Sequence, residues 1–91
     1  MNSFIKIEQK KEGEDGWKFS VSAGGEEFAV TVQKEYWQKL TNEKKTPEKL
    51  VEHSFAFLLE HESVSAILKE FDLSDIQKYF PEYEKTMMNH S

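Results

Sequence analysis

Two alternating segments that flank a pair of glycines constrain the fold of this chain more than any other feature. Residues 17–23 (WKFSVSA) and 27–32 (EFAVTV) alternate apolar and polar side chains with a period of two. This period is typical of strands with one buried face and one face in water. Gly24 and Gly25 between them suit a type I′ turn, in which both central residues need a positive φ. The sequence therefore predicts a β-hairpin.

The apolar pattern also predicts the register of this hairpin. A two-residue turn pairs Ala23 with Glu26, and counting outward gives three further pairs. Those pairs are Val21 with Phe28, Phe19 with Val30 and Trp17 with Val32. Each pair joins two apolar side chains on the same face, and a slip of one residue would break all three.

A third strand is predicted upstream, over residues 4–9 (FIKIEQ), and the polar loop at 10–16 joins it to the hairpin. Ile5 and Ile7 share one face of this strand, whereas Phe4 lies on the other. We expect the three strands to form an antiparallel meander. Its first and third strands would each have a free edge, so that a homodimer through a sheet edge stays open.

Helical spacing begins directly after the hairpin. Residues 34–40 (KEYWQKL) predict a short helix. Thr46, Pro47 and Glu48 then mark the start of a longer one, because Thr caps, Pro suits the first helical position and Glu favours the positive end of the helix dipole. A broad apolar face follows over residues 50–61, which is wide enough to cover a small sheet.

The rest of the chain predicts shorter helices. Residues 63–71 (SVSAILKEF) suggest one that carries Ile67 and Leu68. Residues 74–77 (SDIQ) match a capping box, in which the serine and the glutamine satisfy backbone donors of a new helix. This helix should end before Pro81, because a proline pushes the preceding residue out of the α region.

These elements predict one α+β domain over residues 1–84, followed by a frayed tail at 85–91. We expect a three-stranded antiparallel β-meander with three to four helices packed on one face. The predicted core consists of Trp17, Phe19, Val21, Phe28, Val30, Val32, Trp37, Leu40, Leu50, Val51, Phe55, Leu58, Ile67 and Leu68.

Composition narrows the classes of function. The chain of 91 residues has no Cys, which excludes disulfides, thiolate metal sites and cysteine nucleophiles. Its N-terminus lacks the apolar stretch of a signal peptide, and no segment approaches the roughly 20 apolar residues of a membrane span. We expect a soluble protein in a cytoplasmic setting, without a membrane partner.

No motif predicts catalysis. His53 and His61 would lie two helical turns apart, about 12 Å along the axis, which is too far for one metal ion. No G-x-S-x-G motif and no phosphate-binding glycine loop occurs. We therefore assign no catalytic, cofactor-binding or metal residue and expect no enzyme, since an enzyme would need a cleft with a strongly perturbed titratable group.

The excess negative charge lies in the C-terminal half. Residues 50–91 hold three Lys and eight acidic residues, a difference of −5 that equals the net charge of the whole chain. They include 71–84 (FDLSDIQKYFPEYE), where aromatic and acidic residues alternate closely. One reading is a lid over the core, with Phe71, Leu73, Ile76 and Phe80 facing inward.

The other reading of residues 71–84 is an exposed surface that binds a partner, and one segment can do both. We expect a non-enzymatic protein-interaction or adaptor domain whose partner has a basic surface. Tyr83 is the aromatic expected to be exposed. The candidate partner-binding residues are Asp72, Asp75, Tyr79, Glu82, Tyr83 and Glu84.

The alternative is a nucleic-acid-associated or antitoxin-like regulator. Between residues 34 and 49, lysines are interleaved with Tyr36 and Trp37. Aromatic rings can stack on bases, and lysines can neutralise phosphates. The candidate contacts are Lys34, Lys39, Lys44, Lys45 and Lys49. The acidic net charge and the absence of Arg argue against this alternative.

The order of three motifs resembles that of a known family. Residues 28–84 contain VTVQKEYWQKLT, TPEKLVEHSFAFLLE and FDLSDIQKYFPEYE in succession. This succession is similar to a family of small uncharacterised bacterial proteins with a strand, a YW helix, a proline-initiated helix and a closing FDL…YFPEYE segment. The resemblance implies a bacterial cytosolic setting and no particular activity, cofactor or catalytic residue.

Overall fold

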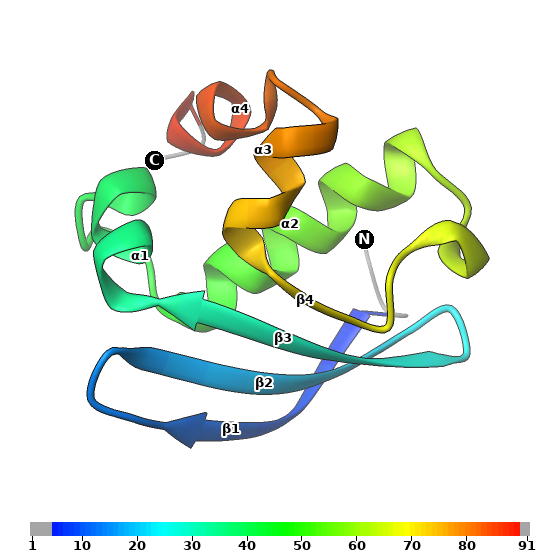
Figure 1. The fold of residues 1–91 in the computed structure, drawn as a ribbon, viewed down its shortest axis with the longest axis horizontal. Coiled ribbons are helices and arrows are strands. Elements are labelled where there is room, and N and C mark those ends of the chain that lie inside the picture. Colours follow the sequence, from blue (N-terminus) through cyan, green and yellow to red (C-terminus); the bar gives the residue numbers. More distant parts are fainter. Residues whose placement is uncertain (1–4, 90–91) are drawn as a thin grey trace.

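The computed structural model describes residues 5–89, which form an α+β fold as the sequence predicts. A four-stranded mixed sheet has the order β1-β2-β3-β4, and Figure 1 shows the four α-helices grouped on one side of the strands. The strands are β1 (Ile5–Glu12), β2 (Gly16–Ala23), β3 (Glu26–Gln33) and β4 (Glu70–Asp72). The helices are α1 (Lys34–Thr41), α2 (Pro47–His61), α3 (Ile76–Tyr79) and α4 (Tyr83–Asn89), with 3-10 turns η1 (Val64–Ala66) and η2 (Leu73–Asp75).

The hairpin of β2 and β3 has the predicted register. Ala23 pairs with Glu26, and the three apolar pairs follow as counted from the turn. Gly24 and Gly25 have φ values of 57° and 84°, the positive values that a type I′ turn requires. The apolar residues of both strands are buried, with Trp17 half-buried at the end.

The first strand is longer than predicted and carries a β-bulge. It runs to Glu12 rather than Gln9, and its register shifts between Ile7 and Gln9. Ile5 and Ile7 lie opposite buried residues of β2, as expected for one apolar face, whereas the predicted opposite-facing Phe4 lies outside the described residues. The bulge adds one residue to this edge strand, which interrupts the ladder that another chain would pair with.

The sheet differs from the predicted meander by its fourth strand. β4 pairs in parallel with β3, and Phe71 lies beside Val30 while Glu70 and Asp72 flank it. The expectation of a free edge on the third strand is therefore wrong over Ala29–Thr31. β4 has only three residues and its partner lies about forty residues earlier, so that no local pattern indicates it.

The two longer helices begin where the sequence places them. Lys49 N donates to Thr46 Oγ1 over 3.1 Å, and Pro47 occupies the first turn of α2. α1 ends at Thr41, and the next residue, Asn42, has a φ of 53°, the left-handed conformation that caps and stops a helix. Phe55 packs against Phe28 and Phe71, with ring centroids 5.2 and 5.9 Å apart, so that α2 covers the sheet.

The capping box lies two residues before its predicted place. Asp72, not Ser74, is the cap: its carboxylate accepts from Ser74 N, while Asp72 N donates to Asp75 Oδ2. The capped element is η2, and α3 follows as a single turn that ends before Pro81 as predicted. Asp and Ser are similarly favoured as N-cap residues. Asp72 is the cap here because β4 ends at this residue and η2 begins directly after it.

The folded domain extends beyond residue 84, its predicted end. Residues 85–89, expected to belong to a frayed tail, are part of α4, and Met87 on that helix is buried. Residues 90 and 91 of that tail lie outside the described residues. Most predicted core residues are buried, and Trp37 packs half-buried against the core. Leu68 is the exception and is exposed.

Gly16 permits the close approach of two backbone segments at the start of β2. A Cβ at this residue would lie 2.1 Å from the carbonyl oxygen of Val32, and φ is +157°. We expect Gly16→Ala to lower the free energy of unfolding by about 3 kcal/mol or more, because the clash involves backbone that cannot rotate away. Urea denaturation followed by circular dichroism measures this change.

Gly25→Ala is the matched control for this prediction. Gly25 has a φ of +84°, but nothing lies within 4 Å of a Cβ there. The expected loss is about 1 to 2 kcal/mol, the cost of a left-handed conformation alone. Equal losses in the two variants would contradict the steric argument for Gly16.

Candidate functional site

An apolar groove lies where the end of α2 meets the segment that leads through β4 into α3. Its volume is about 180 Å³. Its lining consists of Leu58, Glu62, Ala66, Ile67, Leu68, Phe71, Asp75, Ile76, Tyr79 and Phe80. Seven of these side chains are large and apolar or aromatic, which makes the groove suited to an apolar group.

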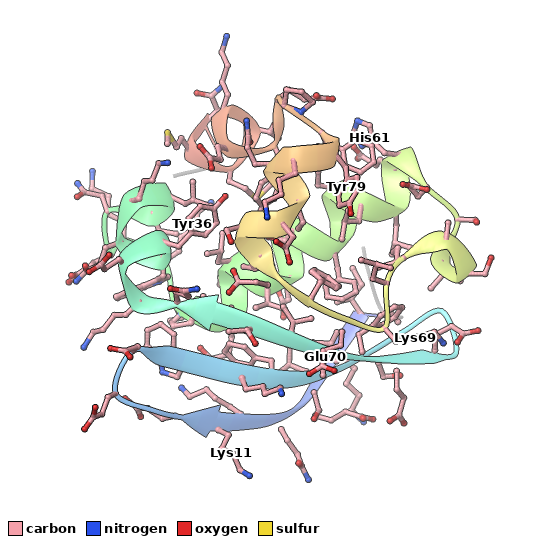
Figure 2. All side chains as sticks on the ribbon, in the orientation of Figure 1. Lys11, Tyr36, His61, Lys69, Glu70 and Tyr79 are labelled. Carbon is pink, nitrogen blue, oxygen red and sulfur yellow. The ribbon has the colours of Figure 1, made fainter. Side chains whose placement is uncertain are left out.

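Two large exposed hydrophobic side chains line the groove. Tyr79 is 67% exposed and Leu68 is 57% exposed, and Met88 on α4 is the only other exposed large hydrophobic residue between residues 5 and 89. Figure 2 shows Tyr79 beside the end of α2 that carries His61. Exposed apolar side chains that adjoin an apolar cavity are typical of binding surfaces.

The local backbone explains why Leu68 and Tyr79 are exposed. η1 ends at Ala66 and Ile67 takes extended φ and ψ angles of −79° and 135°, so that Ile67 and Leu68 do not share a helical face before β4. Ile67 is buried, and Leu68 is consequently exposed. Tyr79 is the last residue of α3, whose single turn ends before Pro81. The predicted helix over 63–71 would have buried both Ile67 and Leu68, and that expectation is wrong for Leu68.

The charged groups that line the groove are acidic. Glu62 and Asp75 belong to the lining, and no lysine does. Lys78 lies 3.2 Å from Asp75 with a side chain that is mostly in solvent, so this pair is weakly held. Lys69, which follows Leu68, is paired with Glu26 on β3. The potential at the groove therefore favours a cationic partner.

An aromatic cluster supports the wall of the groove at Phe80. The ring of His61 lies 4.3 Å from that of Phe57 and 5.2 Å from that of Phe80. His61 Nδ1 donates to the carbonyl oxygen of Phe57 over 2.8 Å, and its Nε2 lies 3.4 Å from Glu82. These contacts join α2 to the turn before α4 and keep Phe80 in place.

The structure separates the six predicted partner-binding residues. Asp75 and Tyr79 line the groove, and Glu82 is adjacent through His61. Asp72 lies at the end of β4, where Gln33 Nε2 donates to it over 3.0 Å. Glu84 is engaged inside the fold, since it accepts from Tyr36 OH over 2.9 Å and pairs with Lys39 over 3.2 Å.

Tyr83 was expected to be the exposed aromatic of this segment, and that expectation is wrong. Its side chain is 0% exposed and packs on Phe57, with ring centroids 5.4 Å apart. Its hydroxyl lies 2.6 Å from Ser54 Oγ, which donates its own hydrogen to the carbonyl oxygen of Leu50. Tyr83 is therefore a core residue, and Tyr79 is the exposed one. Of the predicted inward residues of the lid, Phe71, Leu73 and Ile76 are buried, and Phe80 is half-buried against the core.

Two tyrosines should make the fold sensitive to alkaline pH. Burial raises the pKa of Tyr83, and burial together with the hydrogen bond to Glu84 raises the pKa of Tyr36. Unfolded tyrosine ionises near pH 10, while the folded chain keeps both phenols neutral. Unfolding then releases protons, so the free energy of unfolding should fall as the pH rises above about 10, by up to about 1.4 kcal/mol per pH unit for Tyr83.

Denaturation between pH 8 and pH 11.5 tests this dependence. Tyr83→Phe should flatten the decline relative to the wild type, and adding Tyr36→Phe should flatten it further. The contribution of half-buried Tyr36 is the smaller one because solvent screens it. An unchanged slope in the double variant would contradict the assignment.

The lysines proposed for nucleic acid are spread over α1, the loop after it and the start of α2. Lys39 pairs with Glu84, and Lys49 lies 3.7 Å from Glu52. Lys45 Nζ lies 3.3 Å from His53 Nδ1, and partial burial together with the charge of Lys49 lowers the pKa of Lys45. Lys34 and Lys44 are exposed.

The aromatic residues among these lysines are engaged within the fold. Trp37 packs edge-on against Trp17 at 5.3 Å and donates from Nε1 to the carbonyl oxygen of Lys45 over 2.8 Å. The hydroxyl of Tyr36 is bonded to Glu84. Neither ring is therefore presented for base stacking in this conformation. Nucleic-acid binding stays a prediction that this geometry does not favour.

The groove contains residues that sequence reasoning did not single out as binding residues. Leu68 and Glu62 are the main ones, and they come from two segments that only the fold brings together. The adjacent pair Ile67-Leu68 before Phe71 carried a signal: in extended chain, neighbouring side chains point to opposite sides, so one of the pair is exposed.

Comparisons with known proteins do not assign the chain to a family. No protein-family model, no curated protein and no solved structure matches it. The resemblance to a small bacterial family stays a prediction. Between residues 5 and 89, no helix is long and apolar enough to cross a membrane, and no three His, Asp or Glu side chains are grouped to hold a metal ion.

Proposed function

We propose that this chain is a non-enzymatic protein-interaction domain whose groove binds one apolar side chain of a partner. The observation that carries the proposal is the position of Leu68 and Tyr79, two exposed hydrophobic residues that line the same apolar cavity. A volume of about 180 Å³ is below the roughly 300–1,000 Å³ of small-molecule pockets, and it suits a single side chain.

The charge of the groove indicates the chemistry of the partner. Glu62 and Asp75 line the cavity and no lysine does, so a partner with Lys or Arg next to its apolar anchor gains complementary contacts. Leu58, Phe71 and Ile76 form the inner part of the lining and belong to the core. The site is therefore held by packed secondary structure and needs little ordering when the partner binds.

Immobilised peptide libraries test the proposal. One library has a central Leu or Phe flanked by Lys, and the other has the same centre flanked by Glu. We expect the wild type to retain the Lys-flanked peptides, with less retention at 500 mM than at 50 mM NaCl. Leu68→Ser or Tyr79→Ser should weaken binding about tenfold or more, the loss of one anchoring contact.

Met88→Ser is the matched control, since Met88 is 41% exposed and lies on α4, outside the groove lining. It should bind as the wild type does. All three substitutions are at the surface and should change the free energy of unfolding by about 0.5 kcal/mol or less. Equal retention of both libraries, or equal loss in the Met88 variant, would contradict the proposed site.

A further inference from the structure

The sheet has one face that the helices do not cover. On β2, the buried residues alternate with Lys18, Ser20 and Ser22, which point to the other face. The strand register then places the remaining members of this face, since residues paired across strands share a side. They are Lys6, Gln9 and Lys11 on β1, Glu27, Ala29, Thr31 and Gln33 on β3, and Glu70 and Asp72 on β4.

Charge is divided across this face. Its lysines all lie on β1 and β2, and the acidic residues that the register places on it lie on β3 and β4. Glu8, the unpaired residue of the β1 bulge, adds one exposed carboxylate to the lysine side. The register arranges them in rows: Lys6 is in the row of Glu27, Gln9 in the row of Glu70, and Lys11 in the row of Asp72. Lys11 lies on β1 and Glu70 on β4, the two outer strands of the sheet, and Figure 2 shows Lys11 pointing away from the helices.

Small side chains occupy the middle of the same face. They are Ser20, Ser22, Ala29 and Thr31, and all four are partly buried. Among residues 5–89, no aromatic residue belongs to the face, so the described part of it offers no platform for bases. Because small side chains do not protrude from the middle of the face, another flat surface can approach the strands closely between the charged residues.

We propose that this face pairs with the same face of a second copy of the chain. A twofold axis along the strands, between β2 and β3, places β1 of one copy opposite β4 of the other and β2 opposite β3. The rotation reverses every row, so the lysine side of each copy meets the acidic side of its partner. The small side chains of the two centres then lie against each other, as in aligned sheet packing.

Some charged side chains of this face are already paired within one copy, and others remain for the contact between two copies. Lys18 pairs with Glu70 over 3.1 Å, and Gln33 bonds to Asp72 over 3.0 Å. Among residues 5–89, Lys6, Lys11 and Glu27 make no ion pair. Lys11 also lies directly across from Lys18, and like charges at this position are unfavourable. Acidic groups from a second copy would offset that repulsion.

The size of the face predicts a weak dimer. Three strands of eight residues span about 26 Å each and β4 spans about 10 Å. With about 4.8 Å of width per strand, each copy contributes roughly 400 Å². Stable interfaces use about 800 Å² per partner. We expect a dissociation constant on the order of 100 µM at low salt. The groove lies on the side of the sheet that carries the helices, so dimer formation leaves it open.

Sedimentation equilibrium between 10 and 500 µM protein in 50 mM NaCl tests the proposal. We expect a monomer–dimer equilibrium that weakens at least fivefold in 500 mM NaCl. Lys6→Glu combined with Lys11→Glu should weaken it tenfold or more. The control combines Lys44→Glu with Lys85→Glu, two exposed lysines outside this face, and changes the net charge by the same amount.

A charge exchange gives a second test. Glu27→Lys with Glu70→Lys should also weaken self-association tenfold or more, and a mixture of this variant with the Lys6/Lys11 variant should form a heterodimer. A protein that remains monomeric throughout, or a Lys6/Lys11 variant that associates like its control, would overturn the proposal. Thermal melts of every variant establish that it is folded before association is compared.

Discussion

A chain that ends at Glu70 is expected to lose the cooperative thermal unfolding of the full chain. The truncation removes Phe71 and with it the pairing of β4 to β3. It also removes four more buried residues, namely Leu73, Ile76, Tyr83 and Met87. Each large buried side chain contributes about 1.5 to 3 kcal/mol, and the total stability of a domain is about 5 to 15 kcal/mol. The missing burial is therefore comparable with the whole stability.

Circular dichroism melts compare the truncated chain with the full chain. The control is a chain that ends at Asn89, which keeps every buried residue that the structure describes and should melt like the full chain. A truncated chain with a cooperative melt within a few degrees of the full chain would show that residues 71–89 are not needed to hold the core. The lid interpretation of 71–84 would then be wrong.

Tyr83→Ala and Tyr79→Ala should differ strongly although both remove a tyrosine from the same segment. Tyr83 is fully buried and its hydroxyl is bonded to Ser54, so its removal should cost about 3 to 5 kcal/mol. Tyr79 is mostly exposed, and its removal should cost about 0.5 kcal/mol or less. Urea denaturation of both variants measures the difference.

Tyr83→Phe separates the two contributions of Tyr83. It keeps the ring against Phe57 and removes only the hydroxyl, which should cost about 1 kcal/mol. Ser54 keeps its bond to the carbonyl oxygen of Leu50, so no buried donor loses its partner. A Tyr83→Ala variant as stable as Tyr79→Ala would contradict the buried placement. Because Tyr83→Ala should destabilise the fold strongly, Tyr79 is the tyrosine of this pair that can test partner binding.

The parts of the fold that sequence reasoning predicted are those with short-range determinants. The β2–β3 register follows from a turn length and a period of two, both contained in residues 17–32. The start of α2 follows from the Thr46 cap and from Pro47 in the first turn, because both interact with residues next to them in the sequence. Such features do not depend on what the rest of the chain does.

The features that sequence reasoning missed depend on distant contacts. β4 is too short to have a recognisable period and exists because β3 offers an open edge. α4 extends the domain past residue 84 because Met87 and Tyr83 find space around Ser54 on α2. The capping residue is Asp72 and not the predicted Ser74, because β4 fixes Asp72 directly before η2.

The candidate site divides in the same way. Asp75 and Tyr79 were predicted from the composition of residues 71–84. Aromatic residues are enriched in binding surfaces, and acidic residues complement a basic partner. Leu68 and Glu62 come from other segments and join the groove only in the folded chain. Tyr83 is buried instead of exposed for a simple reason: α3 ends after one turn, and the turn at Pro81 redirects the chain so that Tyr83 faces the core.

By itself, the sequence determined the α+β class, the hairpin with its register, the long helix over one face of the sheet and the excess of negative charge in the C-terminal half. Only the tertiary structure decided the fourth strand, the buried position of Tyr83 and the groove between Leu68 and Tyr79. The physical reason is the range of the interactions. Turns, caps and periodicity act over a few residues, whereas the burial of a side chain depends on which distant segments pack against it.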